Sequence, residues 1–262
     1  MPRIALGLEY DGTAYRGWQA QAHAAGVQAE LERALSLVAD CRIAVTAAGR
    51  TDAGVHAALQ VVHFDAPVDR GPRGWVLGAN THLERDISAL WACVVDDAFH
   101  ARYSALARSY RYVILNRRSR PALMRHRAGW VRELLDAETM HSAAQALRGE
   151  HDFSSFRAAE CQSRTPIRRL ESIAVTRQGD YIRVDVTANA FLHHMVRNIV
   201  GTLLAVGSGD RSAGWVAEVL AARDRRVGGV TAPPQGLYLA GIRYPIEFNI
   251  PAEWLESRRL PE

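Results

Sequence analysis

The chain has 262 residues, of which 48% are hydrophobic and 23% are charged. This length allows one large domain or two small ones, and the composition is that of an ordinary globular protein. The longest apolar stretch begins at Ile199 and is too short to span a membrane, and the N-terminal residues lack the apolar run of a signal peptide. Cys41, Cys93 and Cys161 form no CxxC pair, which excludes a cysteine-based zinc site and favours a reducing, cytoplasmic location.

The charge is distributed unevenly along the chain. All 32 basic residues are arginines, and the formal net charge is +4. From Ala98 to Arg132 there are nine arginines and no acidic residue, with Tyr103, Tyr110 and Tyr112 among them. Arginine binds phosphate with a rigid fork and stacks on bases, and basic residues mixed with aromatic ones are typical of nucleic-acid-binding surfaces. We therefore expect this segment to bind a polyanion.

The first half of the chain alternates strands with amphipathic helices. Residues 3–10 carry apolar side chains at period two, which predicts a strand. Residues 27–39 place their apolar side chains on one helical face. The other elements predicted in this half are strands at 42–48, 60–66 and 87–95 and a weaker helix at 75–83.

The second half repeats this mixture. A strand is predicted at 109–115, and an arginine-rich connection follows it. Asp136 is placed to cap a helix that runs to Leu147, and Gly179 with Asp180 joins two strands as a hairpin. The remaining predicted elements are the two hairpin strands at 170–177 and 181–188, helices at 191–207 and 212–222, and a final strand at 237–244.

These patterns predict an α+β fold rather than a repeated βαβ arrangement. We expect two related sheet-and-helix halves, ferredoxin-like or RRM-like, with mixed, mainly antiparallel sheets. The first half, 1–105, would carry a catalytic loop, and 106–262 would form the second half. A groove between two such halves is a good place for a ligand, and we expect the catalytic groove there.

The segment AAGRTDAGVHA is a predicted tight loop. Gly49 and Gly54 give the backbone freedom, and a residue such as Asp52 favours turns because its side chain bonds to nearby backbone. The loop therefore displays Arg50, Asp52 and His56. Judged by local chemistry alone, it is more often a surface turn than a site, so the rest of the chain must decide its use.

Several familiar chemistries leave no sign in the sequence. There is no Walker loop, no GxGxxG after a strand and no GxSxG elbow. His193 and His194 would be neighbours on a helix and point roughly 100° apart, which prevents them from chelating one metal ion together. We therefore infer no metal and no bound cofactor.

Five segments point to a family. They are, in order, GRTDAGVHA, FHARYSALARSYRYVI, CQSRTP, FLHHMVRNIVGTL and GLYLAGIRYP. Together they resemble the tRNA pseudouridine synthase A family, whose members isomerise uridines at positions 38 to 40, on the 3′ side of the tRNA anticodon stem-loop. The similarity extends from Asp11 to Tyr244, nearly the whole chain. Five motifs in order are far more specific than GRTD alone.

The resemblance implies roles for particular residues. Asp52 would be the catalytic carboxylate, acting as a nucleophile or as the base that removes a sugar proton. Arg50 would contact the RNA, and Tyr110 would stack on the target base. Arg197 would pair with Asp52 and keep it ionised. The reaction only rearranges one nucleotide, so the family needs no cofactor, and His56 is expected to be structural.

The resemblance also implies an RNA-binding surface and a partner. The segments FHARY and QSRTP match tRNA contacts of the family, and two further arginines are placed to meet phosphates. The predicted RNA-binding residues are Arg70, Phe99, His100, Ala101, Arg102, Tyr103, Arg118, Gln162, Ser163, Arg164, Thr165 and Pro166. The family works as a homodimer with one tRNA across both subunits, so a homodimer is expected here.

Two other classes of function are weighed against this one. An RNA-binding module without catalysis could use the same sheet and basic groove, but it would tolerate the loss of Asp52. A glycoside hydrolase would also break a glycosidic bond, with Glu9, Asp11 and Asp52 as candidate carboxylates. Such enzymes usually need two carboxylates that flank the bond. We expect Asp11 instead to cap or turn the end of a strand.

Overall fold

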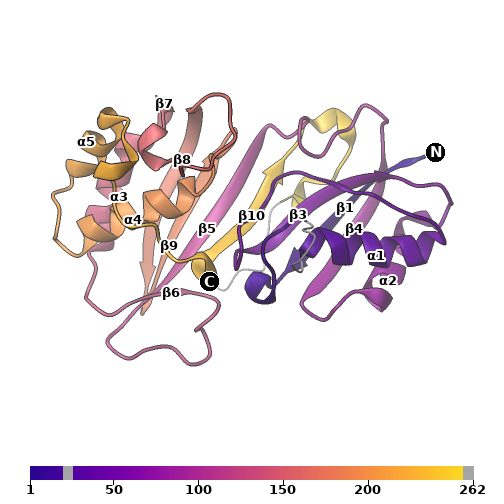
Figure 1. The fold of residues 1–262 in the computed structure, drawn as a ribbon, viewed down its shortest axis with the longest axis horizontal. Helices are drawn as coiled ribbons and strands as arrows, with labels where there is room; N and C mark the ends of the chain where they lie inside the picture. Colours follow the sequence, from indigo (N-terminus) through magenta and orange to yellow (C-terminus); the bar gives the residue numbers. More distant parts are fainter. Residues whose placement is uncertain (20–25, 256–262) are drawn as a thin grey trace. The chain divides into compact units, whose positions relative to one another are not determined.

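The computed structural model describes residues 1–19 and 26–255. The chain forms two compact units: unit 1 comprises Met1–Ala107 with Tyr238–Glu262, and unit 2 comprises Arg108–Leu237. Each unit combines helices with mainly antiparallel strands, so the predicted α+β class is confirmed (Figure 1). The last strand, predicted within the second half, groups with unit 1. The division into domains 1–105 and 106–262 stays a prediction.

In unit 1 the first strand of the chain lies in the middle of the sheet. Strand β1 pairs antiparallel with β3 on one side and β4 on the other, and β10 adds to β3 in parallel (Figure 1). Residues Ile4–Leu8 are buried, which agrees with a strand that has neighbours on both edges. The strands of this unit are β1 (Arg3–Tyr10), β2 (Thr46–Ala47), β3 (His56–Asp65), β4 (Ile87–Val95) and β10 (Leu237–Arg243).

Helices α1 and α2 pack against each other in this unit. Helix α1 (Val27–Ala39) has the bounds that the sequence predicts, and Leu31 and Leu35 of its apolar stripe are fully buried. Helix α2 (Gly71–His82) contacts α1 and β4. A Cβ at Gly78 would lie 2.7 Å from the Val38 side chain, so glycine lets the two helices approach closely there.

Unit 2 has its own antiparallel ladder. Strand β9 lies between β5 and β8, and β7 continues the ladder beyond β8. The predicted hairpin is confirmed, because Gly179 has φ +56 in the turn between β8 and β9. The strands are β5 (Ala107–Asn116), β6 (Gly129–Val131), β7 (Gly149–Asp152), β8 (Ile167–Gln178) and β9 (Tyr181–Ala188).

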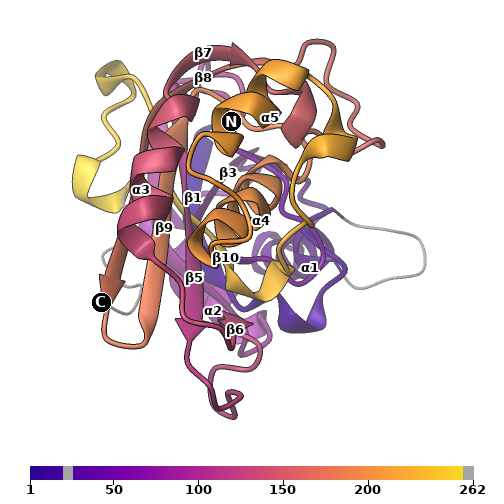
Figure 2. The ribbon, with the colours of Figure 1, turned by 90° about the vertical axis from the view of Figure 1, so that its left-hand side faces the viewer.

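Three helices complete unit 2. Asp136 caps α3 (Ala137–Ala144) as predicted, since its carboxylate accepts hydrogen bonds from the N–H groups of Glu138 and Thr139. Helix α4 (Met195–Gly207) packs beside α3 and is buried along most of its length (Figure 2). Helix α5 (Trp215–Ala222) also contacts α3.

Several sequence predictions differ from the structure. The strand predicted at 60–66 begins at His56, as β3, and the helix predicted at 75–83 begins at Gly71, as α2. The predicted strand at 42–48 is reduced to the two residues of β2. The helix predicted to start at residue 191 starts at Met195, because His194 has φ +61 and breaks the helical path before it. The short strands β6 and β7 were not predicted. Within residues 1–19 and 26–255, none of the helices is long and apolar enough to cross a bilayer.

Candidate active site

The loop that carries Asp52 is a closed turn in unit 1. The Val55 N–H donates to the Asp52 carbonyl at 3.1 Å, and Gly54 has φ +74, a conformation that favours glycine. The Gly54 N–H also donates to the Tyr15 carbonyl at 3.3 Å. The Asp52 side chain is half-buried and that of Arg50 is exposed, so the loop displays both predicted groups.

Thr51 fixes the other side of the turn. Its hydroxyl lies 2.8 Å from the Tyr10 hydroxyl, and its carbonyl accepts a hydrogen bond from the Trp18 N–H at 3.0 Å. Gly17 has φ +100, and a Cβ there would lie 2.7 Å from the same carbonyl. The backbone on both sides of Asp52 is therefore held by neighbouring segments of unit 1, and the loop is more than a free surface turn.

His56 and Asp11 have structural contacts. His56 is 2% exposed and stacks on Tyr238 at 4.8 Å between ring centroids. Its Nδ1 lies 3.0 Å from the Gly12 nitrogen and 3.2 Å from an Asp11 carboxylate oxygen. Asp11 accepts a hydrogen bond from the Thr13 N–H at 3.0 Å, which confirms its predicted capping role. Hydrogen bonding to His56 is the largest cause that lowers the pKa of Asp11. This carboxylate is thus engaged in local structure, unlike a hydrolase's second catalytic acid.

The other two predicted catalytic-site residues belong to unit 2. Arg197 lies in the first turn of α4, and its Nε donates to the Ala232 carbonyl at 2.8 Å. Tyr110 lies on β5, half-buried, with its ring at 83° to that of Phe191 and 5.0 Å between centroids. Both side chains are therefore supported on one side by contacts within their own unit.

The predicted RNA-binding segment FHARY separates into a buried part and an exposed part. Phe99 and Ala101 are each 0% exposed. The Ala101 N–H donates to His63 Nδ1 at 3.1 Å, and the Tyr244 hydroxyl donates to the Ala101 carbonyl at 2.7 Å. The Arg3 guanidinium donates to the Phe99 carbonyl at 3.0 Å. Sequence reasoning missed His63, although a histidine within an apolar strand pattern is a signal for such a buried contact.

The exposed part of FHARY forms a stacked group. Tyr103 is 76% exposed and stacks on His100 at 4.3 Å between ring centroids. The Arg102 guanidinium carbon lies 5.6 Å from the centroid of the Tyr103 ring. An exposed ring beside a guanidinium can stack on a base and meet a phosphate, so this pair suits single-stranded RNA.

Two arginines of unit 2 donate hydrogen bonds to the segment QSRTP and to Cys161, the residue before it. Arg157 donates to the Cys161 carbonyl at 2.6 Å and to the Ser163 carbonyl at 2.9 Å. Arg168 donates to the Ser163 hydroxyl at 2.6 Å. Three predicted RNA-binding side chains of this segment are exposed, namely Gln162, Arg164 and Thr165, while Pro166 is half-buried.

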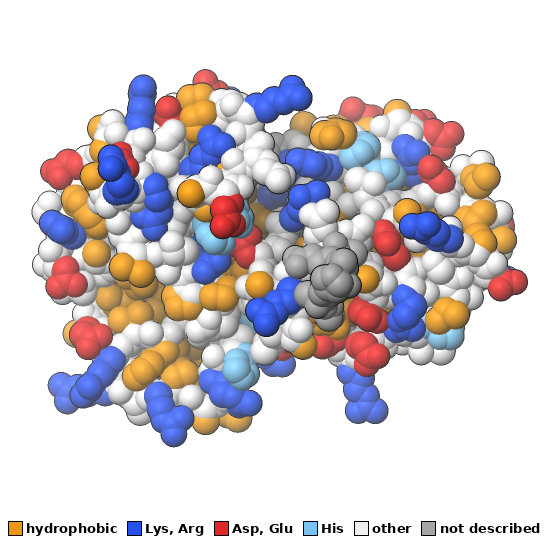
Figure 3. Space-filling view, in the orientation of Figure 1, with side chains coloured by type: hydrophobic (Ala, Val, Ile, Leu, Met, Phe, Trp, Pro, Cys, Tyr) orange, Lys and Arg blue, Asp and Glu red, His pale blue; other side chains and the backbone are white. Residues whose placement is uncertain are grey.

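Arg70 and Arg118 are the two predicted RNA-binding residues outside the motifs FHARY and QSRTP. Arg70 donates from Nε to the Val38 carbonyl at 3.1 Å at the start of α2, and Arg118 is exposed in the loop after β5. On the face shown in Figure 3, arginine side chains lie at many separate points, with acidic side chains between some of them. Each arginine taken alone therefore gives little indication of RNA contact.

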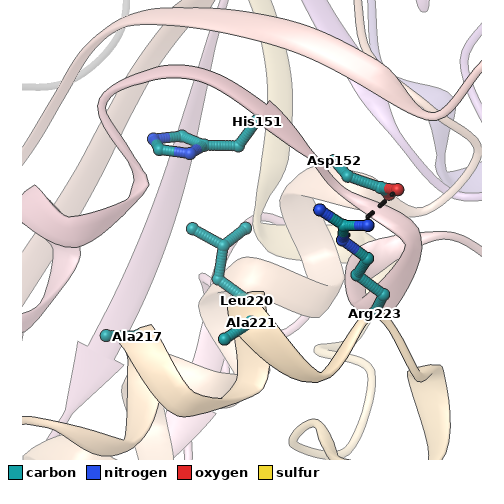
Figure 4. Close-up of a pocket in the computed structure, with 6 residues that line it drawn as sticks. All are labelled: His151, Asp152, Ala217, Leu220, Ala221 and Arg223. Carbon is teal, nitrogen blue, oxygen red and sulfur yellow. Dashed lines mark ion pairs between the residues drawn. The ribbon is translucent and has the colours of Figure 1, made fainter.

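Unit 2 also has a pocket of about 330 Å³ between β7 and α5 (Figure 4). Arg223 and Asp152 approach within 3.7 Å at its wall, as the dashed line marks. None of the described residues that line it is a predicted site residue. The lining residues are His151, Asp152, Ala217, Leu220, Ala221 and Arg223.

The prediction that His193 and His194 are neighbours on a helix is wrong. Both residues precede α4, and their ring centroids lie 4.0 Å apart with the ring planes tilted by 39°. The left-handed backbone at His194 replaces the helical rotation of roughly 100° between neighbours, so the two imidazoles lie close together. The helix-based reason for excluding joint metal binding therefore does not apply to this pair.

Comparison with known proteins identifies the family. The sequence profile described as tRNA pseudouridine synthase matches residues 8–104 and 143–245. The first matched segment includes the Asp52 loop and FHARY, and the second includes QSRTP and Arg197. Tyr110 lies in the stretch between the two matched segments.

Individual relatives agree over nearly their full length. A protein of Shewanella denitrificans named tRNA pseudouridine synthase A is 55% identical over 95% of this chain and 95% of its own. Proteins of the same name from Coxiella burnetii and Methylococcus capsulatus are 55% and 56% identical, over 96% and 95% of this chain and 96% and 92% of theirs. The chain therefore belongs to the tRNA pseudouridine synthase family.

Proposed function

We propose that this chain isomerises uridine to pseudouridine in tRNA, with Asp52 as the carboxylate that acts on the ribose. The observation that carries this proposal is the Asp52 loop. It has the family sequence GRTDAGVHA, and hydrogen bonds to Thr51, Gly54 and Val55 hold its backbone on both sides of the carboxylate. A catalytic group needs such a fixed backbone, because small misplacements of a reacting group are costly.

The chemistry requires a carboxylate and little else. The N1–C1′ bond breaks, the uracil turns, and C5 bonds to C1′. The C5 proton then leaves and N1 gains one, so atoms and electrons balance without an oxidant or a reductant. Asp52 acts either as a nucleophile, whose bond to the ribose breaks again when C5 bonds to C1′, or as the base that removes a sugar proton, which is returned when C5 bonds to C1′. Each route needs Asp52 to be ionised, and a guanidinium favours that form.

Arg197 is the proposed cation partner of Asp52, and Tyr110 is the proposed platform for the target base. Arg197 is suited to a fixed role because α4 and the Ala232 carbonyl both restrain it. Tyr110 has a half-buried ring whose position is supported by Phe191. Arg50 is exposed on the same loop as Asp52, where we propose that it contacts the RNA backbone.

The proposed RNA surface uses the exposed members of the two motifs. We assign direct contact to Arg102 and Tyr103 in FHARY and to the exposed side chains of QSRTP. Phe99 and Ala101 would instead support the backbone of FHARY from inside unit 1, since neither is exposed. A uridine in a stem must leave the helix to be reached, which costs a few kcal/mol. Stacking on aromatic rings and phosphate contact by arginine offset that cost.

Membership of the family supports three finer parts of the proposal: the substrate region, the location and the oligomeric state. The proposed substrate region is the anticodon stem-loop of tRNA, and the proposed working form is a cytoplasmic homodimer of chains with domains 1–105 and 106–262. Light scattering of the purified protein tests the dimer. A mass twice that of one chain is expected, and a mass equal to one chain would contradict it.

The test of the activity is to map pseudouridine in bulk tRNA from cells that lack this chain. We expect pseudouridine to disappear from the 3′ side of the anticodon stem-loop and to return when the wild-type chain is expressed again. Expression of Asp52→Asn at an equal level should not restore it. Unchanged pseudouridine in the deletion strain, or restoration by Asp52→Asn, would contradict the proposal.

A further inference from the structure

One side of helix α4 is covered by a loop, residues 228–233, that lies against its backbone. A Cβ at Gly201 would lie 1.7 Å from the Val230 carbonyl oxygen, and a Cβ at Gly229 would lie 2.5 Å from the Gly201 carbonyl oxygen. The Gly229 N–H donates to the Thr202 hydroxyl at 3.2 Å. The two glycines therefore allow a backbone-to-backbone contact that any side chain would prevent.

Arg225 fastens this loop to the helix. Its Nη2 lies 3.0 Å from Asn198 Oδ1, 2.8 Å from the Gly229 carbonyl oxygen and 3.0 Å from the Thr231 hydroxyl. The Thr231 hydroxyl lies 2.7 Å from the same Asn198 oxygen. Asn198 is 1% exposed, so these polar groups form a buried network in which removal of one partner leaves others unpaired.

The residue after Thr231 holds Arg197. The Ala232 N–H donates to the Arg197 carbonyl at 3.0 Å, and Arg197 Nε donates to the Ala232 carbonyl at 2.8 Å. The next residue, Pro233, accepts a hydrogen bond from the Tyr112 hydroxyl at 2.9 Å. The loop is thus fixed near both ends, and its second-to-last residue, Ala232, carries the carbonyl that orients the Arg197 guanidinium.

We propose that Arg225 is a positioning residue for the reaction. It fixes the 228–233 loop so that the Ala232 carbonyl holds the Arg197 guanidinium in one orientation. This inference rests on the proposed function, because Arg197 has a catalytic partner only there. Family resemblance did not point to Arg225, and no short motif in the sequence marks it.

All three acceptors lie within 3.0 Å of one guanidinium nitrogen, Nη2, at the far end of the arginine side chain. A lysine ammonium also donates, but its stem is one bond shorter and it reaches fewer of these acceptors, and a methionine has no donor. Arg225→Lys should therefore restore part of what Arg225→Met removes. The neighbouring Arg226 serves as a matched control, because it is exposed and bonds to Asp224 rather than to the loop.

The experiment measures single-turnover isomerisation and tRNA affinity for each full-length variant. Arg225→Met should slow the chemical step about tenfold or more, because displacement of a group by about 1 Å can cost up to about a hundredfold. Its tRNA affinity should stay close to wild type, and Arg225→Lys should fall between the two rates. Arg226→Met should react at the wild-type rate.

A double-mutant cycle separates positioning from a general loss of structure. In an Arg197→Lys background the Nε–H bond to Ala232 is already lost, so Arg225→Met should slow the reaction little further. A wild-type rate for Arg225→Met, or an equal fold-loss in both backgrounds, would overturn the inference. If Arg225→Met does not fold, Thr231→Val carries the test, with a smaller loss expected and an unchanged rate contradicting it.

Failure of the proposed catalytic role of Arg197 can be distinguished from failure of the positioning role of Arg225. Arg197→Ala at the wild-type rate would remove Arg197 from the reaction, whatever Arg225→Met does. A slow Arg197→Ala together with a wild-type Arg225→Met would leave the proposed function standing and overturn only the positioning role of Arg225.

Discussion

His63 accepts a hydrogen bond at Nδ1 from the backbone N–H of Ala101, across 3.1 Å inside unit 1. The acceptor nitrogen must be unprotonated for this bond to form. Burial, then the nearby charges of His100 and Arg3, lower the pKa of His63 to about 4. The exposed pair Arg102 and Tyr103, which we propose contacts RNA, follows Ala101 directly, so the protonation of His63 is linked to the support of that surface.

A fall in pH should therefore destabilise unit 1 already at pH values higher than those at which carboxylates titrate. The pKa of His63 falls from 6.5 unfolded to about 4 folded, so the unfolded state binds more protons within that window. One such proton lowers the free energy of unfolding by at most about 1.4 kcal/mol per pH unit as the pH falls. Denaturant unfolding from pH 7 to pH 4 measures this slope.

His63→Asn is the matched variant for that measurement. Its amide oxygen can still accept from the Ala101 N–H, but it does not titrate. The slope of stability against pH should become shallower, with a remainder from His100, whose pKa burial also lowers. An identical slope in the variant would show that His63 does not cause the acid sensitivity.

Gly17 should be required for the Asp52 loop. Alanine there must adopt φ +100 and place its Cβ 2.7 Å from the Thr51 carbonyl oxygen, whereas Gly209 has φ +82 with open space around it. Gly209→Ala should cost only the left-handed conformation, about 1–2 kcal/mol. Gly17→Ala should lose about 1–3 kcal/mol more, because the backbone must move. Thermal unfolding measures both, and equal losses would contradict the contact.

Gly17→Ala should also slow isomerisation, since the backbone that it displaces adjoins Asp52. Gly209→Ala should not, because it lies after α4 and away from the 228–233 loop in the sequence. A wild-type rate for a folded Gly17→Ala would show that the position of Thr51 has no influence on the reaction.

Replacement of Arg102 and Arg118 by alanine should weaken tRNA binding and flatten its salt dependence. Each lost phosphate contact should reduce the slope of log affinity against log salt by roughly 0.7–0.9. The control replaces Arg211 and Arg226, which lie in unit 2 outside the segment 98–132, so that the same charge is removed. If both pairs reduce the slope equally, the effect is one of net charge and the segment 98–132 is not the binding surface.

The sequence predicted the elements whose periodicity extends over several turns or whose ends carry a strong signal. Helix 27–39 agrees with α1 at both ends because Leu31 and Leu35 continue one apolar stripe up to Asp40, which ends it at φ +55. Strand 87–95 agrees with β4 in the same way. By contrast, β6 and β7 have three and four residues, too few for any period to be visible.

Tertiary contacts decided the remaining features of the fold. The pattern of FLHHMVRNIVGTL predicts one helix, yet the backbone at His194 is left-handed. The residues of this run before His194 lie outside the helix, and the His193 N–H donates to Cys161 Sγ at 3.4 Å. Composition also cannot tell a buried member of a motif from an exposed one. Phe99 and Ala101 adjoin Arg102 and Tyr103 in sequence, and only the structure separates their roles.

The candidate site was predictable to the extent that motifs mark it. Asp52 and Arg197 lie in motifs that the family match includes. Arg225 lies in no such motif, because its role depends on reaching Asn198 and Thr231, which are 27 and 6 residues away in the chain. Hydrogen bonds between side chains that are brought together only by the fold have no signature in a single sequence.

The carboxylate of Asp52 is the group that we propose performs the chemistry. Asparagine has nearly the same shape and still accepts hydrogen bonds, but it carries no charge and is a poor nucleophile and base. Asp52→Asn should therefore fold like the wild type and bind tRNA with similar or better affinity. Those two measurements show that any lost activity is a loss of chemistry.

The deciding measurement is tritium release from tRNA whose uridines are labelled at C5, with wild type and Asp52→Asn compared in single turnover. That hydrogen leaves only after C5 has bonded to C1′, so its release reports the completed isomerisation. The wild type should release tritium and yield no free uracil, and Asp52→Asn should release none above the background without protein. Tritium release by Asp52→Asn at close to the wild-type rate would contradict the assignment of Asp52.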